Sequence, residues 1–140
     1  MKSLLILGAG GFGHMIKETA QALGYEEIVF LDDMVKEDDV IGMCCDYVIK
    51  HEDYPVAVAA FGNNKTRLFW TDKLLEEGYE VPAIVHPSAV VSPSVTLEPG
   101  CFIMQRSVVN TNTKIERAAL VNSGAVVDHN SVVGAGAHVG

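Results

Sequence analysis

The chain has 140 residues, a formal net charge of −8, 49% hydrophobic residues and 20% charged residues. This composition is typical of a globular protein and excludes a chain that is disordered throughout. Apolar runs such as residues 4–8 are far shorter than the ~20 residues of a membrane-spanning helix, and the start does not resemble a signal peptide. We therefore expect a cytoplasmic protein without membrane contact.

The charge is unevenly placed along the chain. Residues 1–82 hold 7 basic and 15 acidic side chains, which sum to −8, whereas residues 83–140 hold 3 of each, which sum to 0. Neither part attracts a polyanion, so we expect no binding of nucleic acid. The three cysteines, Cys44, Cys45 and Cys101, have no recurring spacing and are expected to be reduced. The five histidines are scattered without a metal-ligand cluster, so no metal is predicted.

The first predicted elements are a strand, a glycine-rich loop and a helix. Ser3 to Leu7 is typical of a buried parallel strand, and the apolar side of His14 to Leu23 predicts a helix. The glycines between them would let the backbone approach a diphosphate at the helix N-terminus. A tight turn between strand and helix is the structural alternative. The candidate ligand-binding residues here are Gly8, Gly10, Gly11 and Gly13.

A second strand is predicted from Ile28 to Leu31, and two carboxylates, Asp32 and Asp33, follow it directly. In β-α-β nucleotide-binding units, an acidic residue about 20 positions after the glycine loop contacts a ribose or a base. Asp32 and Asp33 are therefore candidate substrate-binding residues. The alternative is that they only open a loop after the strand.

A third strand, Val56 to Phe61, runs into a polar loop and then a helix that begins near Lys65. Such loops follow the carboxyl ends of parallel strands, where open α/β sheets bind ligands. The candidate binding residues in this loop are Gly62, Asn63 and Asn64, and the alternative for the asparagines is capping of the helix. With about 80 residues before the next pattern begins, the unit suits a mononucleotide-sized ligand better than a dinucleotide.

From Ala83 onward the sequence repeats in consecutive units of six residues without a slip in register. The first position of each unit is small or compact, and the third is aliphatic. These third positions are Val85, Val91, Leu97, Ile103, Val109, Ile115, Val121, Val127, Val133 and Val139. A period of six suits a three-sided prism in which each third residue points to the axis and stacks on the next coil. A β-sandwich would instead alternate with period two and vary in strand length.

The predicted fold is thus an α/β Rossmann-like N-terminal domain over residues 1–82, followed by a left-handed parallel β-helix over residues 83–140. The repeat stops within a unit at Gly140, so we expect the β-helix to be incomplete at the C-terminus. Each coil of a repeat protein buries its face only against a neighbour. We therefore expect the exposed end of the last coil to be poorly protected unless another chain packs against it.

Several motifs together resemble the bacterial sugar O-/N-acetyltransferases, which include sialic-acid O-acetyltransferase-like proteins and UDP-4-amino-sugar N-acetyltransferases. The motifs are the loop 8–13, Leu31-Asp32-Asp33, residues 61–64, 84–87 and 127–130. The resemblance implies a homotrimer that binds a UDP-sugar through the first domain and acetyl-CoA between adjacent β-helices.

The resemblance also implies roles for two histidines of the repeat region. His129 matches the catalytic base, and His138 matches a histidine that lies near the acetyl donor and is expected to bind this co-substrate. Two residues depart from the family pattern. Asn130 stands where an acidic residue often follows the base, and Phe12 stands where the glycine loop often has a histidine. Without the resemblance, His129 would be interpreted as a solvated turn residue.

The sequence therefore predicts an enzyme that moves an acetyl group from acetyl-CoA to the amino group of a nucleotide-linked sugar, with His129 as general base and without a metal. Two other classes remain. One is a non-catalytic nucleotide-sugar binder or scaffold. The other is a small NAD-dependent oxidoreductase, suggested by the glycine loop and Asp32, which leaves the repeats unexplained.

Overall fold

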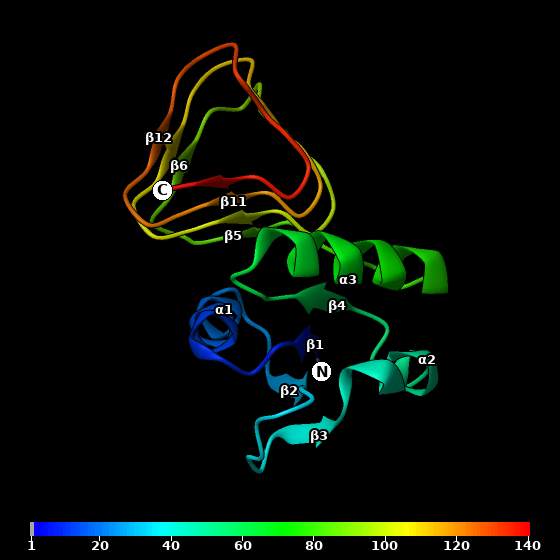
Figure 1. The fold of residues 1–140 in the computed structure, drawn as a ribbon. Coiled ribbons are helices and arrows are strands. Elements are labelled where there is room, and N and C mark those ends of the chain that lie inside the picture. Colours follow the sequence, from blue (N-terminus) through cyan, green and yellow to red (C-terminus); the bar gives the residue numbers. More distant parts are fainter. Residues whose placement is uncertain (1) are drawn as a thin grey trace.

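The computed structural model describes residues 2–140, in which a small α/β unit lies against one side of a three-sided β-helix (Figure 1). Both predicted parts are present and in the expected order. Within the described residues, no helix has both the length and the apolar character needed to cross a membrane.

The N-terminal unit is built on a parallel sheet with the strand order β3-β2-β1-β4. The strands are β1 (Ser3–Leu7), β2 (Glu27–Leu31), β3 (Val40–Gly42) and β4 (Ala57–Ala59). The strands predicted from their apolar runs are confirmed, although β4 is shorter than its run. Strand β3 was not predicted, because its three residues are only half-buried and give no clear hydrophobic pattern.

The helical segments of this unit are α1 (Gly11–Ala22), the 3₁₀ turn η1 (Cys44–Asp46), α2 (Tyr47–Lys50) and α3 (Asn64–Glu77), of which α3 leads from β4 into the β-helix. The predicted start of the first helix at His14 is wrong, because α1 already begins at Gly11, inside the glycine motif. Helix α3 begins where an asparagine cap predicts it. The Asn63 side chain accepts a hydrogen bond from the Thr66 N–H at 2.9 Å.

The β-helix consists of three coils and the first strand of a fourth. Its short parallel strands stack into three sheets, in the orders β5-β8-β11-β14, β6-β9-β12 and β7-β10-β13. The strands are β5 (Ile84–Val85), β6 (Val90–Val91), β7 (Thr96–Leu97), β8 (Phe102–Ile103), β9 (Val108–Val109), β10 (Lys114–Ile115), β11 (Leu120–Val121), β12 (Val126–Val127), β13 (Val132–Val133) and β14 (His138–Val139).

The corners of the prism also repeat every six residues. From residue 100 on, the sixth residue of each unit has positive φ, at Gly100, Arg106, Asn112, Ala118, Gly124, Asn130 and Gly136. A left-handed residue turns the chain sharply, and glycine and asparagine adopt it at low cost. The turns of the β-helix therefore lie at the end of each unit.

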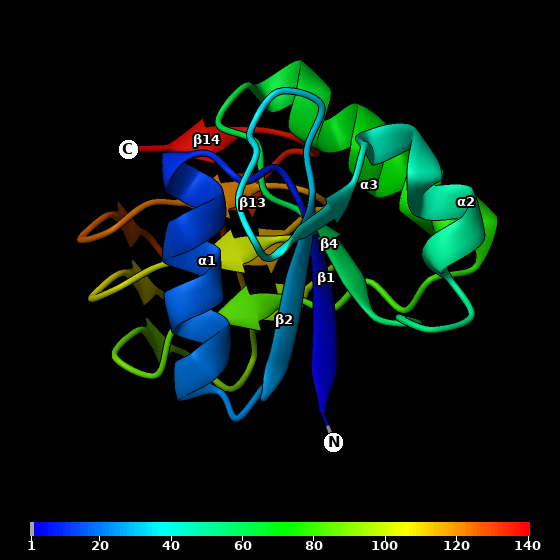
Figure 2. The same cartoon turned by 90° about the horizontal axis from the view of Figure 1, so that it is seen from below.

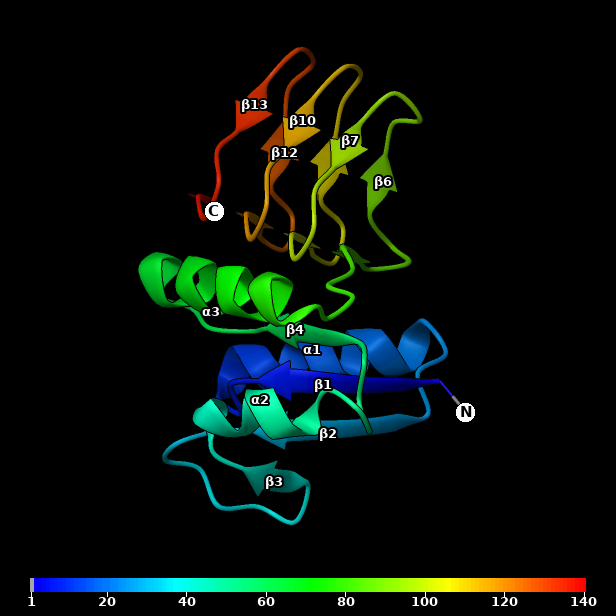
Figure 3. The ribbon, with the colours of Figure 1, turned by 90° about the vertical axis from the view of Figure 1, so that its right-hand side faces the viewer.

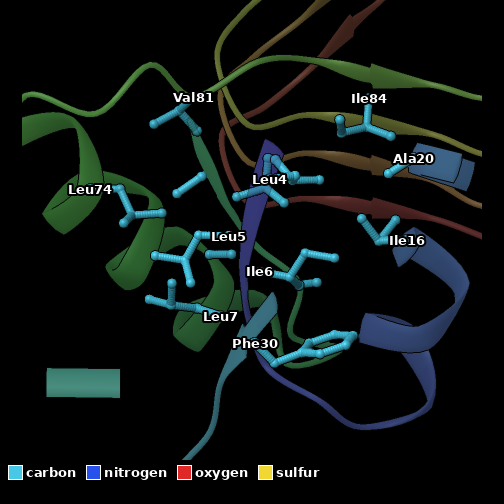
Figure 4. Packing of buried hydrophobic residues seen from close by; sticks show 14 of the residues in the cluster. Leu4, Leu5, Ile6, Leu7, Ile16, Ala20, Phe30, Leu74, Val81 and Ile84 are labelled. Atoms are coloured by element: carbon cyan, nitrogen blue, oxygen red, sulfur yellow. The ribbon is translucent and has the colours of Figure 1, made fainter. Parts of the chain in front are cut away.

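Two hydrophobic cores follow from this arrangement. The third positions of the repeats fill the prism axis, as predicted, and include Ile103, Val121 and Val127. Second positions point outward, but on the sheet β5-β8-β11 they are buried, because the N-terminal unit covers that side. Ile84, Phe102 and Leu120 thereby join the core formed by β1, α1 and α3 (Figure 4).

Helix α3 lies between β4 and the β-helix (Figure 3), and α1 contacts both β1 of the parallel sheet and β5 of the β-helix. In α1, Phe12 packs edge-on against Phe102, with 5.2 Å between ring centroids. Phe12, which departs from the family pattern, is thus a packing residue between the two parts. Helix α3 lies along the prism corner that contains Gly100 and Gly136, where added Cβ atoms would touch Thr71 and Leu68.

Candidate functional site

Two glycines of the first loop are required by the fold itself. Gly8 has φ +100°, and a Cβ there would lie 2.7 Å from the Ala60 carbonyl oxygen. A Cβ on Gly13 would overlap the carbonyl oxygen of Gly8. These residues let β1 pass closely over the start of α1, so their presence is explained by packing alone.

The other glycines have no such structural reason. Gly10, Gly11 and Gly62 are exposed, and a Cβ added at any of them would meet nothing within 4 Å. Gly10 is the N-cap of α1 but has no side chain to cap it, and the first turn of α1 has no acidic residue. The space beside these residues is therefore open to an anionic ligand, which the positive end of a helix favours.

The Asp32 carboxylate, directly after β2, holds the glycine loop through a hydrogen bond. Its Oδ2 accepts a hydrogen bond from the Ala9 N–H at 2.8 Å, and its Oδ1 accepts from the N–H groups of Met34 and Val35, both at 2.8 Å. Burial acts to raise the pKa of this carboxyl, but the three N–H groups outweigh it and hold the pKa below its usual value. Asp32 thus shapes the loop, while its part in substrate binding stays a prediction.

Asp33 is exposed at the same edge, and its Oδ1 accepts a hydrogen bond from the Cys44 N–H at 2.9 Å. Burial, with the nearby carboxylates of Asp33 and Asp32, raises the pKa of the Cys44 thiol to about 12. Burial also raises the pKa of Cys101 to about 12. Both thiols are protonated near neutral pH, so neither is a nucleophile there.

The second polar loop lies at the start of α3. Asn63 caps the helix, and the Asn64 Oδ1 accepts a hydrogen bond from Nη2 of Arg67 at 3.0 Å. Both asparagine side chains therefore have structural partners, which bears out the capping alternative for Asn63 without excluding a ligand contact. Sequence reasoning missed Arg67, because an arginine in a helix rich in polar residues is normally solvent-exposed.

His129 lies in the turn between β12 and β13, where it is exposed. The turn is well ordered by its neighbours. The Asp128 Oδ1 accepts a hydrogen bond from the His129 N–H, and the Asn130 Oδ1 lies 2.8 Å from the imidazole Nδ1. Asn130, in the left-handed conformation, donates its N–H to the Thr111 carbonyl oxygen at 2.9 Å. The imidazole is therefore held from one side and presents Nε2 to solvent.

His138 has a different environment. It pairs with Leu120 across β14 and β11, and so continues the outward row that begins with Ile84 and Phe102. The earlier members of this row are buried under the N-terminal unit, but His138 is exposed. Figure 2 shows β14 at the same end of the molecule as the start of α1 and the glycine loop.

One chain does not bring all the predicted site residues together. The glycine loop, the loop at Gly62 and His138 lie at one end of the seam between the two parts. His129 lies at the corner between the other two sheets, which is the corner farthest from the N-terminal unit (Figure 1). Among residues 2–140, no group of three His, Cys, Asp or Glu side chains is placed to hold a metal ion.

Comparisons with known proteins agree with this architecture. Residues 3–74 match the model of the PglD N-terminal domain. The acetyltransferase domain of PglB from Neisseria gonorrhoeae, solved with acetyl coenzyme A, is 34% identical, with a TM-score of 0.93 over 98% of this chain and 69% of that one. The chain belongs to the left-handed β-helix sugar N-acetyltransferases.

Two further structures extend this result. A mutant of perosamine N-acetyltransferase from Caulobacter crescentus, solved with CoA and GDP-perosamine, is 30% identical, with a TM-score of 0.93 over 99% of this chain and 68% of that chain. WeeI from Acinetobacter baumannii, 20% identical with a TM-score of 0.83, shares the fold. Membership of this acetyltransferase family accounts for both the glycine loop and the repeats, which the NAD-dependent oxidoreductase hypothesis did not.

The open space beside Gly11 leads to a first prediction. Gly11→Val should fold, because its side chain meets no neighbour, and should weaken nucleotide-sugar binding by about tenfold or more by filling the space of the diphosphate. Isothermal titration calorimetry measures this effect. Ala22→Val, at the exposed far end of the same helix, is the matched control and should bind like the parent. Parent-like binding by Gly11→Val would show that the loop is only a turn.

Proposed function

We propose that the protein transfers an acetyl group from acetyl-CoA to the amino group of a sugar linked to a nucleoside diphosphate, with His129 as the general base. The proposal depends mainly on one observation. The exposed imidazole of His129 is held at Nδ1 by the side chain of the next residue, on a scaffold shared with sugar N-acetyltransferases.

The contact with Asn130 favours the tautomer that a base needs. With the Asn130 amide oxygen as acceptor, Nδ1 carries the hydrogen and Nε2 keeps its lone pair. An amide in this place orients the ring as a carboxylate would, although without its charge. The departure from the family pattern at Asn130 is therefore compatible with a basic Nε2.

The chemistry then needs one proton transfer. The sugar amine attacks the thioester carbonyl carbon, a C–N bond forms, and the Nε2 atom of His129 takes the proton that the amine loses. Collapse of the tetrahedral intermediate breaks the C–S bond, and the proton passes to the departing thiolate of coenzyme A. Because the thioester is already activated, orientation of the two substrates and removal of this proton supply most of the rate gain.

The nucleotide is proposed to bind at the carboxyl edge of the parallel sheet. The exposed Gly10, Gly11 and Gly62 leave room for the diphosphate beside two helix starts, and Asp33 is exposed at the same edge. We propose a UDP-sugar as the substrate. Because the Caulobacter relative was solved with GDP-perosamine, a GDP-linked sugar is the main competitor to test.

The outer face of the sheet β6-β9-β12 supports assembly into a homotrimer. Val90, Val108 and Val126 form an aligned row on it, and the first and last are 64% and 63% exposed. An exposed apolar sheet face of this kind fits a second copy of the chain, and cyclic symmetry would close the contacts. This face ends at the corner that holds His129. We therefore propose that His129 of one chain serves the substrates held by its neighbour.

The direct test is turnover by the full-length protein with acetyl-CoA and a UDP-linked or GDP-linked 4-amino sugar. We expect release of free coenzyme A thiol and a sugar nucleotide heavier by one acetyl group, detected by thiol titration and mass spectrometry. Binding of the sugar nucleotide without turnover would favour the non-catalytic binder instead. A matched assay with the 4-hydroxy sugar measures the preference for an amine over a hydroxyl acceptor.

A further inference from the structure

Among the described residues, Arg67 is the one charged side chain that is completely buried. It lies on α3, and burial lowers the pKa of its guanidinium. No carboxylate of residues 2–140 pairs with it. Burying a charge without a counterion is costly, so every N–H must find a strong acceptor.

Some of these acceptors belong to the polar loop after β4. Nη1 donates to the Phe61 carbonyl oxygen at 3.0 Å and to the Gly62 carbonyl oxygen at 3.3 Å. Nη2 donates to the Asn64 Oδ1 at 3.0 Å. One guanidinium thus holds both ends of the short loop that includes Gly62, a proposed sugar-nucleotide contact.

The remaining acceptors belong to the β-helix. Nε donates to the Ala118 carbonyl oxygen at 2.7 Å, and Nη2 donates to the carbonyl oxygens of Gly136 at 3.1 Å and Ala137 at 3.3 Å. Ala118 and Gly136 occupy the same corner in successive coils, and Ala137 directly precedes His138. The planar guanidinium therefore fixes the strand that carries His138 relative to the loop at Gly62.

A second arginine, which forms an ion pair, also links α3 to the β-helix, and comparison with it shows which contacts are particular to Arg67. Arg117 donates to Asp72 at 2.8 Å, which also links α3 to the β-helix, but both side chains are about two-fifths exposed and neither touches the loop. Thr71 of α3 also lies close to Gly100, where an added Cβ would be 2.7 Å from the Thr71 Cγ2. Attachment of α3 to the prism therefore has other sources. What only Arg67 provides is a rigid link between the loop and the coil of His138.

We propose that Arg67 is a positioning residue for the acetyl transfer. It sets the distance between the sugar nucleotide, proposed to bind beside the loop 61–64, and the acetyl donor, which is expected beside His138. This inference rests on the proposed function. A planar fork with five N–H groups defines such a distance, whereas a lysine ammonium on a flexible chain cannot reach the same acceptors together. Small errors in the placement of two reactants are costly for turnover and cost little in the binding of either one.

Arg67→Lys in the full-length protein tests this role, with Arg117→Lys as the matched control. We expect Arg67→Lys to lower kcat per binding site by about 10- to 100-fold, while the Kd values for the sugar nucleotide and acetyl-CoA, each titrated alone, stay within about threefold of the parent. Arg117→Lys should keep the parent kcat. A purely structural role would lower the melting temperature and the number of binding sites, but not kcat per site.

A parent-like kcat per site in Arg67→Lys would overturn the proposal, and so would a loss of sugar-nucleotide affinity that accounts for the whole effect. Should Arg67→Lys not fold, Asn64→Ala removes one of the six acceptors and is expected to lower kcat about 3- to 10-fold with unchanged acetyl-CoA affinity. An unchanged kcat there would equally contradict the role of Arg67.

A second readout separates this inference from the proposed function. If the parent itself transfers no acetyl group, the proposed function fails, and the coupling is then measured by amide hydrogen exchange. Binding of the UDP-sugar should slow exchange at residues 136–139 in the parent and leave it unchanged in Arg67→Lys. Absence of any slowing in the parent would show that Arg67 does not couple the loop to this strand.

Discussion

His129→Ala is expected to lower kcat by about 10²- to 10⁴-fold, which is the usual contribution of a positioned general base. Sugar-nucleotide affinity should stay near the parent value, because the nucleotide is proposed to bind at the sheet edge, away from the His129 corner of the same chain. Steady-state kinetics gives kcat, and calorimetry gives the affinity. In this variant kcat should therefore fall while the sugar-nucleotide affinity is kept.

A histidine at another corner provides the control. His86 lies in the first coil, and its Nδ1 accepts a hydrogen bond from the Ser88 N–H at 3.0 Å, so this imidazole is also held by a neighbouring residue but carries its hydrogen on Nε2. His86→Ala should keep the parent kcat. A His129→Ala rate within a few-fold of the parent would remove His129 from the mechanism, and a non-catalytic sugar-nucleotide binder would become the better explanation of the fold.

Mixing two variants that are each impaired is expected to restore activity at a sugar-nucleotide concentration well below the Kd of Gly11→Val. If each site takes His129 from one chain and the glycine loop from its neighbour, a random mixture of His129→Ala and Gly11→Val chains forms some sites with both native residues. In a closed ring assembled from equal amounts, about a quarter of the sites are of this kind. The two proteins are unfolded and refolded together, and the rate is compared with that of each variant refolded alone.

A variant that cannot form the trimer is the control for this experiment. Val126→Glu places a charge in the row formed by Val90, Val108 and Val126. This charge should keep the chains monomeric, and because the side chain is exposed it should not disturb the core of the β-helix. Light scattering at tens of micromolar should report a trimer for the parent and a monomer for this variant, and the monomer should be inactive. No recovery from the mixture, with parent-like activity in a Val126→Glu monomer, would place the whole site within one chain.

Local pattern was sufficient for much of the fold. The six-residue period assigns the inward residue of each unit, such as Val121 or Val127, because the strand and the turn both lie within one unit. Strand β1 was equally clear from its continuous apolar run. The start of α1 was not clear, because Gly11 and Gly13 are poor helix formers, and the close approach of Gly13 to Gly8 at the end of β1 arises only in the tertiary structure.

Some features of the candidate site were likewise predictable from local sequence, and others depend on the tertiary structure. The sequence alone determined the glycine loop, the polar loop at Asn63 and the turn of His129, because each is a local arrangement of a few residues. The tertiary structure decided that the Asp32 carboxylate braces the loop at Ala9, since hydrogen-bond partners 23 residues apart are not encoded by any spacing.

The tertiary structure also decided the roles of Arg67 and of the sheet face under the N-terminal unit. The carbonyl acceptors of Arg67 on the β-helix lie 51 to 70 residues away, and only the docking of α3 on a prism corner brings them into reach. The same docking buries the outward row that begins with Ile84 and leaves the row of Val126 free. Which side of a three-sided prism is covered depends on how two separately encoded parts pack together, because the repeat itself makes all three sides alike.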